Sequence, residues 1–258
     1  MTGKLIFFDI DGTLLDHDKR LPDSTKQAIN ELKRAGHEVA IATGRGPFMF
    51  EWLRDELGID SFVSYNGQYV VRGGEVVATN PIKRELLDRL TEEAARNGHP
   101  IVYMSSETMK SNTDGHERIE KSITELKVKL PEHDPEFYIG QEIYQCLLFC
   151  TYGEEGIYKD AFRGELDFIR WHQFSTDVLP LGGSKAAGIE AFIRHAGVRR
   201  EDVYAFGDAL NDIEMLQYVG NGIAMGNAID SVKAAAKYVT RDVDDDGIRY
   251  GLRMVGLL

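Results

Sequence analysis

Two carboxylates near the N-terminus have the spacing of a chemical site. Asp9 and Asp11 directly follow the apolar run of residues 5–8, and Gly12-Thr13 comes next. An apolar run of this kind predicts a buried strand, so two negative charges fall where water is scarce. This arrangement raises the free energy of the folded chain unless a cation, a hydrogen-bond network or a reaction uses it. The pair therefore indicates a metal-dependent carboxylate site.

Other polar residues that could take part in chemistry follow apolar runs later in the chain. They are Thr43-Gly44-Arg45, Asn66, Gly207-Asp208, Asn211 and Asp212, together with Lys185, which follows a Gly-Gly-Ser turn. In a doubly wound sheet, ligands bind beyond the carboxyl ends of the strands. We therefore expect these side chains to meet at one edge of a sheet.

The elements that must position these residues alternate between strand and helix. In the first third, the pattern predicts strands at 4–9, 38–42 and 61–65, helices at 23–35 and 47–57, and a hairpin of 69–71 with 75–78. In the last third, it predicts helices at 185–195, 211–218 and 230–236 and strands at 203–206, 222–225 and 238–240. Short strands, each followed by a helix and a glycine, indicate right-handed βαβ units and a parallel sheet.

The middle of the chain has a different pattern. Its predicted strands, at about 101–105, 143–151 and 166–174, are richer in polar and aromatic residues and alternate as half-exposed antiparallel strands do. We therefore predict an α/β fold with a doubly wound, parallel-sheet (Rossmann-like) core over residues 1–81 and 182–258. An inserted α+β cap domain is expected over residues 82–181.

Composition excludes several classes of partner. The 258 residues carry a net charge of −12, which argues against a nucleic-acid or anionic-membrane surface. No stretch approaches the roughly 18 apolar residues of a membrane span, and the N-terminus does not resemble a signal peptide, so the simplest location is the cytoplasm. Cys146 and Cys150 would lie roughly 13 Å apart on a strand, too far for a disulfide, so we expect two buried free cysteines. The sequence makes no prediction of the oligomeric state.

Four segments resemble, in order, the motifs of the haloacid dehalogenase superfamily of phosphohydrolases. Asp9-Ile10-Asp11-Gly12-Thr13 is similar to the first motif, Thr43-Gly44-Arg45 to the second, Lys185 to the third, and Gly207-Asp208-Ala209-Leu210-Asn211-Asp212 to the fourth. The order and spacing resemble the Cof-type branch, whose cap is inserted between the second and third motifs. The resemblance covers the core, roughly 1–80 and 182–258, whereas the cap shares only its position and general character.

The residues themselves suit phosphoryl transfer, which needs an in-line nucleophile and cations around the phosphoryl oxygens. Asp9 can attack phosphorus to form an aspartyl-phosphate. Asp11 can protonate the leaving alkoxide and then activate water. The ammonium of Lys185 suits a phosphate and also offsets the acids.

The resemblance implies further roles. Mg²⁺ would be held by Asp9, Asp208 and the backbone carbonyl of Asp11, and it prefers hard oxygen ligands. The implied phosphate-binding residues are Ile10, Thr43, Gly44, Lys185 and Asn211. Asp212 would orient Lys185 or support the metal site, and Arg45 would form a supporting salt bridge. Asn66 either faces the substrate or, with Gly67, forms a hairpin turn.

We therefore predict a Mg²⁺-dependent phosphatase that hydrolyses a small phosphorylated metabolite, either a sugar phosphate or a phosphorylated cofactor, through an aspartyl-phosphate. The cap would select the leaving group. One alternative is a phosphomutase or phosphotransferase that uses the same intermediate. Mutases of the β-phosphoglucomutase kind, however, carry a cap between the first two motifs, where this chain has only a helix and a strand. The other is a non-catalytic phospho-aspartate receiver or binding module, which has no use for Asp11 as an acid or base or for a cap.

Overall fold

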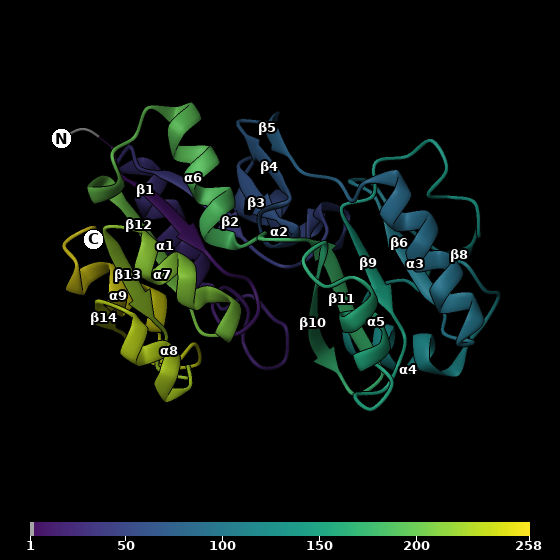
Figure 1. Ribbon diagram of the computed structural model, residues 1–258. Coiled ribbons are helices and arrows are strands. Elements are labelled where there is room, and N and C mark those ends of the chain that lie inside the picture. Colours follow the sequence, from purple (N-terminus) through teal and green to yellow (C-terminus); the bar gives the residue numbers. More distant parts are fainter. Residues whose placement is uncertain (1–2) are drawn as a thin grey trace. The chain divides into compact units, whose positions relative to one another are not determined.

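The computed structural model describes residues 3–258, which form two compact units (Figure 1). The first unit comprises residues 3–45, 51–79 and 184–258. The second comprises residues 46–50 and 80–183. The described residues include no helix that is both long and apolar enough to cross a membrane.

The first unit is built on an eight-stranded sheet in the order β14-β13-β12-β1-β2-β3-β4-β5. The strands are β1 (Leu5–Phe8), β2 (Glu38–Ala42), β3 (Phe62–Ser64), β4 (Tyr69–Arg72), β5 (Glu75–Thr79), β12 (Val203–Gly207), β13 (Asn221–Ala224) and β14 (Tyr238–Val239). Neighbours from β14 to β3 are parallel, and β3-β4-β5 are antiparallel. The predicted Rossmann-like sheet is confirmed. Because β1 lies between β2 and β12, the strand order reverses beside it, which is where such sheets bind ligands.

Helices cover both faces of this sheet. They are α1 (Asp23–Arg34), α2 (Glu51–Leu57), α6 (Lys185–Ala196), α7 (Ile213–Tyr218), α8 (Asp230–Ala235) and α9 (Gly247–Met254). Successive β1 residues point to opposite faces: Phe7 packs edge-to-face on Phe192 of α6, whereas Phe8 stacks on Phe206. A Cβ on Gly251 of α9 would meet the Phe206 ring at 2.6 Å, so α9 lies on the Phe8 side.

The predicted helix at 47–57 forms only in part. Pro47–Met49 is a short 3-10 helix (η1), and α2 begins at Glu51. Between them, Phe50 leaves the helical region with φ of −132°. Phe50 is fully buried, so packing overrides local helical preference at this point. Residues 46–50, which include η1 and Phe50, belong to the second unit.

The second unit is a six-stranded sheet in the order β10-β11-β9-β6-β7-β8, antiparallel except for β7 and β8. Its strands are β6 (Ile101–Met104), β7 (Met109–Ser111), β8 (Glu132–His133), β9 (Gln145–Leu148), β10 (Leu166–His172) and β11 (Ser175–Pro180). Its helices are α3 (Arg84–Arg96), α4 (Glu117–Glu125) and α5 (Gly156–Ala161). Leu87 and Leu90 of α3 and Tyr158 of α5 share one apolar core with Cys146. Cys146 and Cys150 are buried and free, as predicted.

Candidate active site

Asp9 is the first residue beyond the carboxyl end of β1. Its N–H donates to the Phe206 carbonyl at 3.0 Å, which continues the ladder between β1 and β12, and its side chain is buried. The chain then turns sharply at Gly12, whose φ is +77°. A Cβ on Gly12 would lie 2.3 Å from Asp208 Oδ2, so the missing side chain lets Asp208 approach this turn.

Lys185 opens α6 and connects two of the acids. The Ser184 hydroxyl caps the helix by accepting from the Ala187 N–H at 3.2 Å. Lys185 is only 1% exposed, and its Nζ lies 2.5 Å from Asp9 Oδ1 and 2.7 Å from Asp212 Oδ1. Burial alone would lower the pKa of Lys185, but Asp212 and Asp9 raise it above the ordinary value for lysine. The ammonium therefore stays charged between the two carboxylates.

Asp212 is fixed through both of its carboxylate oxygens. Oδ1 binds Lys185, and Oδ2 accepts the N–H groups of Asp208 and Ala209 at 2.9 Å each. The residue is completely buried. These contacts hold the loop after β12 in place and orient the Lys185 ammonium.

Carboxylate oxygens of Asp9, Asp208 and Asp212 lie within 4.8 Å of one another. Burial raises the pKa of Asp9 well above its usual range, although the charge of Lys185 opposes the shift. Burial likewise raises the pKa of Asp208 to about 6, against the hydrogen bond from Thr13. The neighbouring carboxylates add to both shifts. Hard, mutually repelling oxygens are a donor set that fits Mg²⁺.

The Asp11 side chain has different partners. Arg45 binds it with two parallel hydrogen bonds, Nε to Oδ2 at 2.7 Å and Nη2 to Oδ1 at 2.8 Å. Lys19 Nζ donates to Oδ1 at 2.5 Å. Burial alone would raise the pKa of Asp11, but the hydrogen bonds and charges of Arg45 and Lys19 hold it below its ordinary value. Arg45 thus makes the supporting salt bridge that the sequence predicts, with Asp11 as its partner.

Lys19 is a site residue that sequence reasoning missed. It lies in the loop between β1 and α1, in the left-handed region with φ of 61°. Its N–H donates to the Asp16 carbonyl at 3.0 Å, and the Arg20 N–H donates to the Asp16 side chain at 2.8 Å. This turn directs the Lys19 side chain toward Asp11, where its Nζ donates to the carboxylate. A charged loop after the first motif is the only signal in the sequence, and it does not reveal where the side chain points.

The remaining predicted residues meet at the ends of β2 and β3. Thr43 is buried, and its hydroxyl accepts the Arg45 N–H at 3.1 Å. Asn66 has left-handed φ and ψ of 50° and 41°, and its Oδ1 accepts from Asn211 Nδ2 at 3.1 Å. A Cβ on Gly44 would lie 3.1 Å from Asn66 Nδ2. Asn66 therefore forms the predicted turn and also faces Gly44 and Asn211.

Ile10 contributes backbone rather than side-chain chemistry. Its side chain is fully buried, and its carbonyl accepts the Leu15 N–H at 2.8 Å in the turn after β1. Ile10 thus shapes the loop that carries both Asp9 and Asp11.

The comparisons with known proteins extend over the whole chain. The family model for haloacid dehalogenase-like hydrolases matches residues 6–252. The putative phosphatase YkrA of Bacillus subtilis (strain 168) is 50% identical over 100% of both chains. Pyridoxal phosphate phosphatase YbhA of Escherichia coli (strain K12) is 28% identical, covering 96% of this chain and 97% of its own. The solved structure of BT4131, described as a subclass IIB sugar phosphatase, is 33% identical with a TM-score of 0.85, covering 99% of this chain and 100% of its own.

Proposed function

Because the chain belongs to the haloacid dehalogenase-like hydrolase family, we propose that it is a Mg²⁺-dependent phosphatase that forms an aspartyl-phosphate on Asp9. Its substrate would be a small phosphorylated metabolite. One observation carries the proposal: the buried Lys185 ammonium lies between Asp9 and Asp212, and Asp208 completes an acidic cluster around Asp9. Removing these charged groups from water costs free energy, and such buried networks of titratable groups are typical of functional sites.

In the first step, Asp9 supplies the nucleophile. Lys185 binds Asp9 Oδ1, and the other carboxylate oxygen forms a new bond to phosphorus as the ester P–O bond breaks. The electron pair of the broken bond leaves with the alkoxide, which takes a proton from Asp11. The Lys185 ammonium balances charge on the transferring group.

In the second step, Asp11 accepts a proton from water as the water oxygen attacks phosphorus. The bond between phosphorus and Asp9 breaks, which releases inorganic phosphate and regenerates the carboxylate. Arg45 and Lys19 hold Asp11 ionised, which is the form that this step requires. For the first step, Asp11 must gain a proton. The anionic phosphate of a bound substrate would also interact with Arg45 and Lys19. Their interaction with Asp11 would then weaken, and the pKa of Asp11 would rise.

Asp9, Asp208 and the Asp11 backbone carbonyl would hold Mg²⁺. Asp212 is left as support because Lys185 and two backbone N–H groups occupy its carboxylate. When bound, Mg²⁺ neutralises charge on the phosphoryl oxygens and on the acidic cluster. Thr43, Gly44 and Asn211 would donate to the other phosphoryl oxygens, and Asn66 would orient Asn211.

Hydrolysis of p-nitrophenyl phosphate in the presence of Mg²⁺, and its loss with a chelator, tests this proposal. Ranking phosphorylated metabolites by kcat/KM would then identify the substrate. A protein that becomes phosphorylated on Asp9 without turnover would instead be a receiver, and one that returns the phosphoryl group to an organic acceptor would be a mutase or transferase.

A further inference from the structure

Asn227 contacts the acidic cluster but belongs to none of the four motifs. It lies in the turn after β13, and it is half-buried. Its Nδ2 donates to the Gly12 carbonyl at 2.9 Å and lies 3.4 Å from Asp208 Oδ2. Its Oδ1 accepts the Val243 N–H at 3.0 Å. A single amide therefore contacts the turn after β1, the loop after β12 and the segment after β14.

The partners of Asn227 fix the direction in which its amide points. A backbone N–H can only donate, so the Val243 N–H must face the amide oxygen. The NH₂ group then faces two acceptors, the Gly12 carbonyl and the Asp208 carboxylate. The 2.9 Å contact with Gly12 has an ordinary hydrogen-bond length, whereas the 3.4 Å contact with Asp208 is long. Gly12 is therefore the main partner of the NH₂ group.

The backbone beside Asn227 packs against the same segment that binds its amide oxygen. The Gly226 N–H donates to the Arg241 carbonyl at 2.7 Å. A Cβ on Gly226 would lie 2.3 Å from the Asp242 backbone nitrogen, so only glycine allows this approach. Because Val243 follows directly, both the backbone of this turn and the Asn227 side chain are anchored on one neighbouring segment.

The contact with Asn227 completes the fixing of the turn at Gly12. The Gly12 N–H donates to the Leu15 carbonyl at 3.0 Å, and the Gly12 carbonyl accepts from Asn227. The peptide groups on both sides of Gly12 are therefore held. The Asp11 carbonyl belongs to the same peptide group as the Gly12 N–H. Since glycine has little conformational preference of its own, loss of the Asn227 contact would let this peptide group turn.

We propose that Asn227 is a positioning residue for Mg²⁺, because it holds the Gly12 turn, and with it the Asp11 carbonyl, beside Asp208. This inference rests on the proposed function, in which the Asp11 carbonyl and Asp208 bind the cation. Asn227 acts through these two groups and supplies a donor without adding charge to the acidic cluster. Removing a group that orients a metal ligand typically lowers metal affinity or activity about 10–100-fold.

Calorimetric titration with Mg²⁺, in the absence of substrate, tests the proposal. Asn227→Ala removes every contact of the amide and should weaken Mg²⁺ binding about tenfold or more. Asn221→Ala is the matched control. At the amino end of β13, Asn221 Nδ2 donates to the Glu201 carbonyl at 3.1 Å, so this variant also loses a hydrogen bond from an asparagine to the backbone. It should change the Mg²⁺ affinity less than about twofold, because it lies at the opposite end of the strand.

Urea denaturation without Mg²⁺ separates positioning from general stability. Both variants should be less stable than the wild type, because each loses hydrogen bonds to the backbone. A positioning role predicts that only Asn227→Ala also loses Mg²⁺ affinity. Asn227→Ser leaves a smaller gap, but its hydroxyl is too short to reach both partners, so it should show the same loss and replaces the alanine variant if that variant does not fold.

The inference is overturned if a folded Asn227 variant binds Mg²⁺ as tightly as the wild type, or if Asn221→Ala weakens binding equally. Absence of Mg²⁺ binding by the wild type would overturn it as well. Hydrolysis of p-nitrophenyl phosphate distinguishes these failures from failure of the proposed function. If Asn227→Ala loses Mg²⁺ affinity but the wild type hydrolyses no ester, the positioning role stands and the phosphatase proposal fails. If the wild type hydrolyses the ester and Asn227→Ala keeps its Mg²⁺ affinity, the positioning role alone fails.

Discussion

Lys185 Nζ lies 2.5 Å from Asp9 Oδ1, and both side chains are buried. The same ammonium contacts Asp212 at 2.7 Å. One lysine therefore compensates two carboxylates that are largely removed from solvent. In the proposed mechanism the same side chain also binds the phosphate, so a change at Lys185 should affect both activity and stability.

Lys185→Met should abolish phosphatase activity and lower the free energy of unfolding. Removing one partner of a buried ion pair leaves an uncompensated charge, which costs roughly 3–5 kcal/mol. Urea denaturation at pH 7 measures the loss, with Lys26→Met as a surface control. Adding Asp212→Asn to Lys185→Met should restore part of the stability but none of the activity. If Lys185→Met were as stable as the wild type, the Lys185 network would not support the fold as described.

Asp11→Asn should slow both formation and breakdown of the phosphorylated enzyme while leaving Mg²⁺ affinity largely unchanged. The amide cannot exchange the proton, and general acid–base catalysis typically contributes about 10²–10⁴-fold. Rapid-quench kinetics resolves the two steps, and calorimetric titration with Mg²⁺ measures the affinity. A collapse of Mg²⁺ affinity would show that the Asp11 side chain, rather than its backbone carbonyl, holds the metal.

Gly188→Ala should destabilise the protein and impair catalysis together. A Cβ at Gly188 would meet Val63 Cγ1 at 2.4 Å and Gly67 Cα at 2.7 Å, where α6 packs on the end of β3. The overlap should cost about 1–3 kcal/mol and displace the helix turn that carries Lys185. Gly156→Ala in α5 meets nothing within 4 Å and is the matched control. Thermal unfolding and kcat/KM check both variants, and equal behaviour of the two would contradict this packing.

Glu154 should make stability depend on pH in the acid range. The N–H of Thr151 first, and then Arg118, lower the pKa of Glu154 to about 2, below the ordinary value of 4.5. The stabilisation is therefore complete above pH 4.5 and is lost as the pH falls toward 2. Its size is about 1 kcal/mol or less, because the side chain is 37% exposed and solvent screens the pair.

Urea denaturation of the wild type and Glu154→Gln at pH 6, 4 and 3 measures this effect. The stability difference between the two proteins should shrink as the solution is acidified. A difference that stays constant or grows would show that Glu154 is not held by these contacts.

The fold of the first unit could be predicted because its strands and helices alternate and each has a signal in its own stretch of sequence. Apolar runs such as Leu5–Phe8 end at polar residues and glycines, and in the structure Leu5–Phe8 is a fully buried strand. The short strands of the second unit carry no such signal. Met109–Ser111 pairs with β6, which precedes it closely in the chain, and with Glu132–His133, which lies farther along the sequence. The second pairing depends on tertiary structure, which local propensity cannot reveal.

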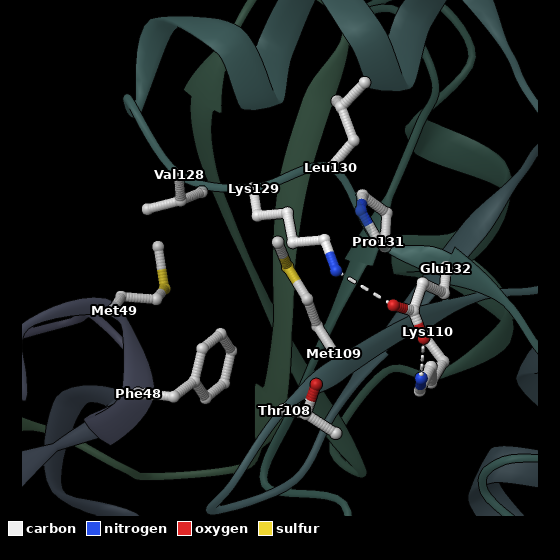
Figure 2. A pocket seen from close by; sticks show the side chains of 10 residues that line it. All are labelled: Phe48, Met49, Thr108, Met109, Lys110, Val128, Lys129, Leu130, Pro131 and Glu132. Carbon is white, nitrogen blue, oxygen red and sulfur yellow. Dashed lines mark hydrogen bonds and ion pairs between the residues drawn. The ribbon is translucent and has the colours of Figure 1, made fainter.

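The site residues likewise fall into those that the sequence predicts and those that it does not. Asp9, Lys185 and Asp208 lie at ends of elements, so the fold brings them together wherever the βαβ pattern holds. Lys19 reaches Asp11 from a loop in which it adopts a left-handed conformation, and Phe48 and Met49 line a cavity (Figure 2) beside the point where the predicted helix is interrupted. Such positions depend on tertiary packing, which a single sequence does not display.

Trapping the phosphorylated enzyme tests the central claim most directly. Wild-type protein would be mixed with Mg²⁺ and a ³²P-labelled phosphate ester, quenched in acid, and assayed for label on the protein. We predict acid-stable label on the wild type and on Asp55→Asn, a control at an exposed acid, and neither label nor turnover with Asp9→Asn in a protein that remains folded. Turnover by Asp9→Asn, or label that persists in that variant, would contradict Asp9 as the nucleophile.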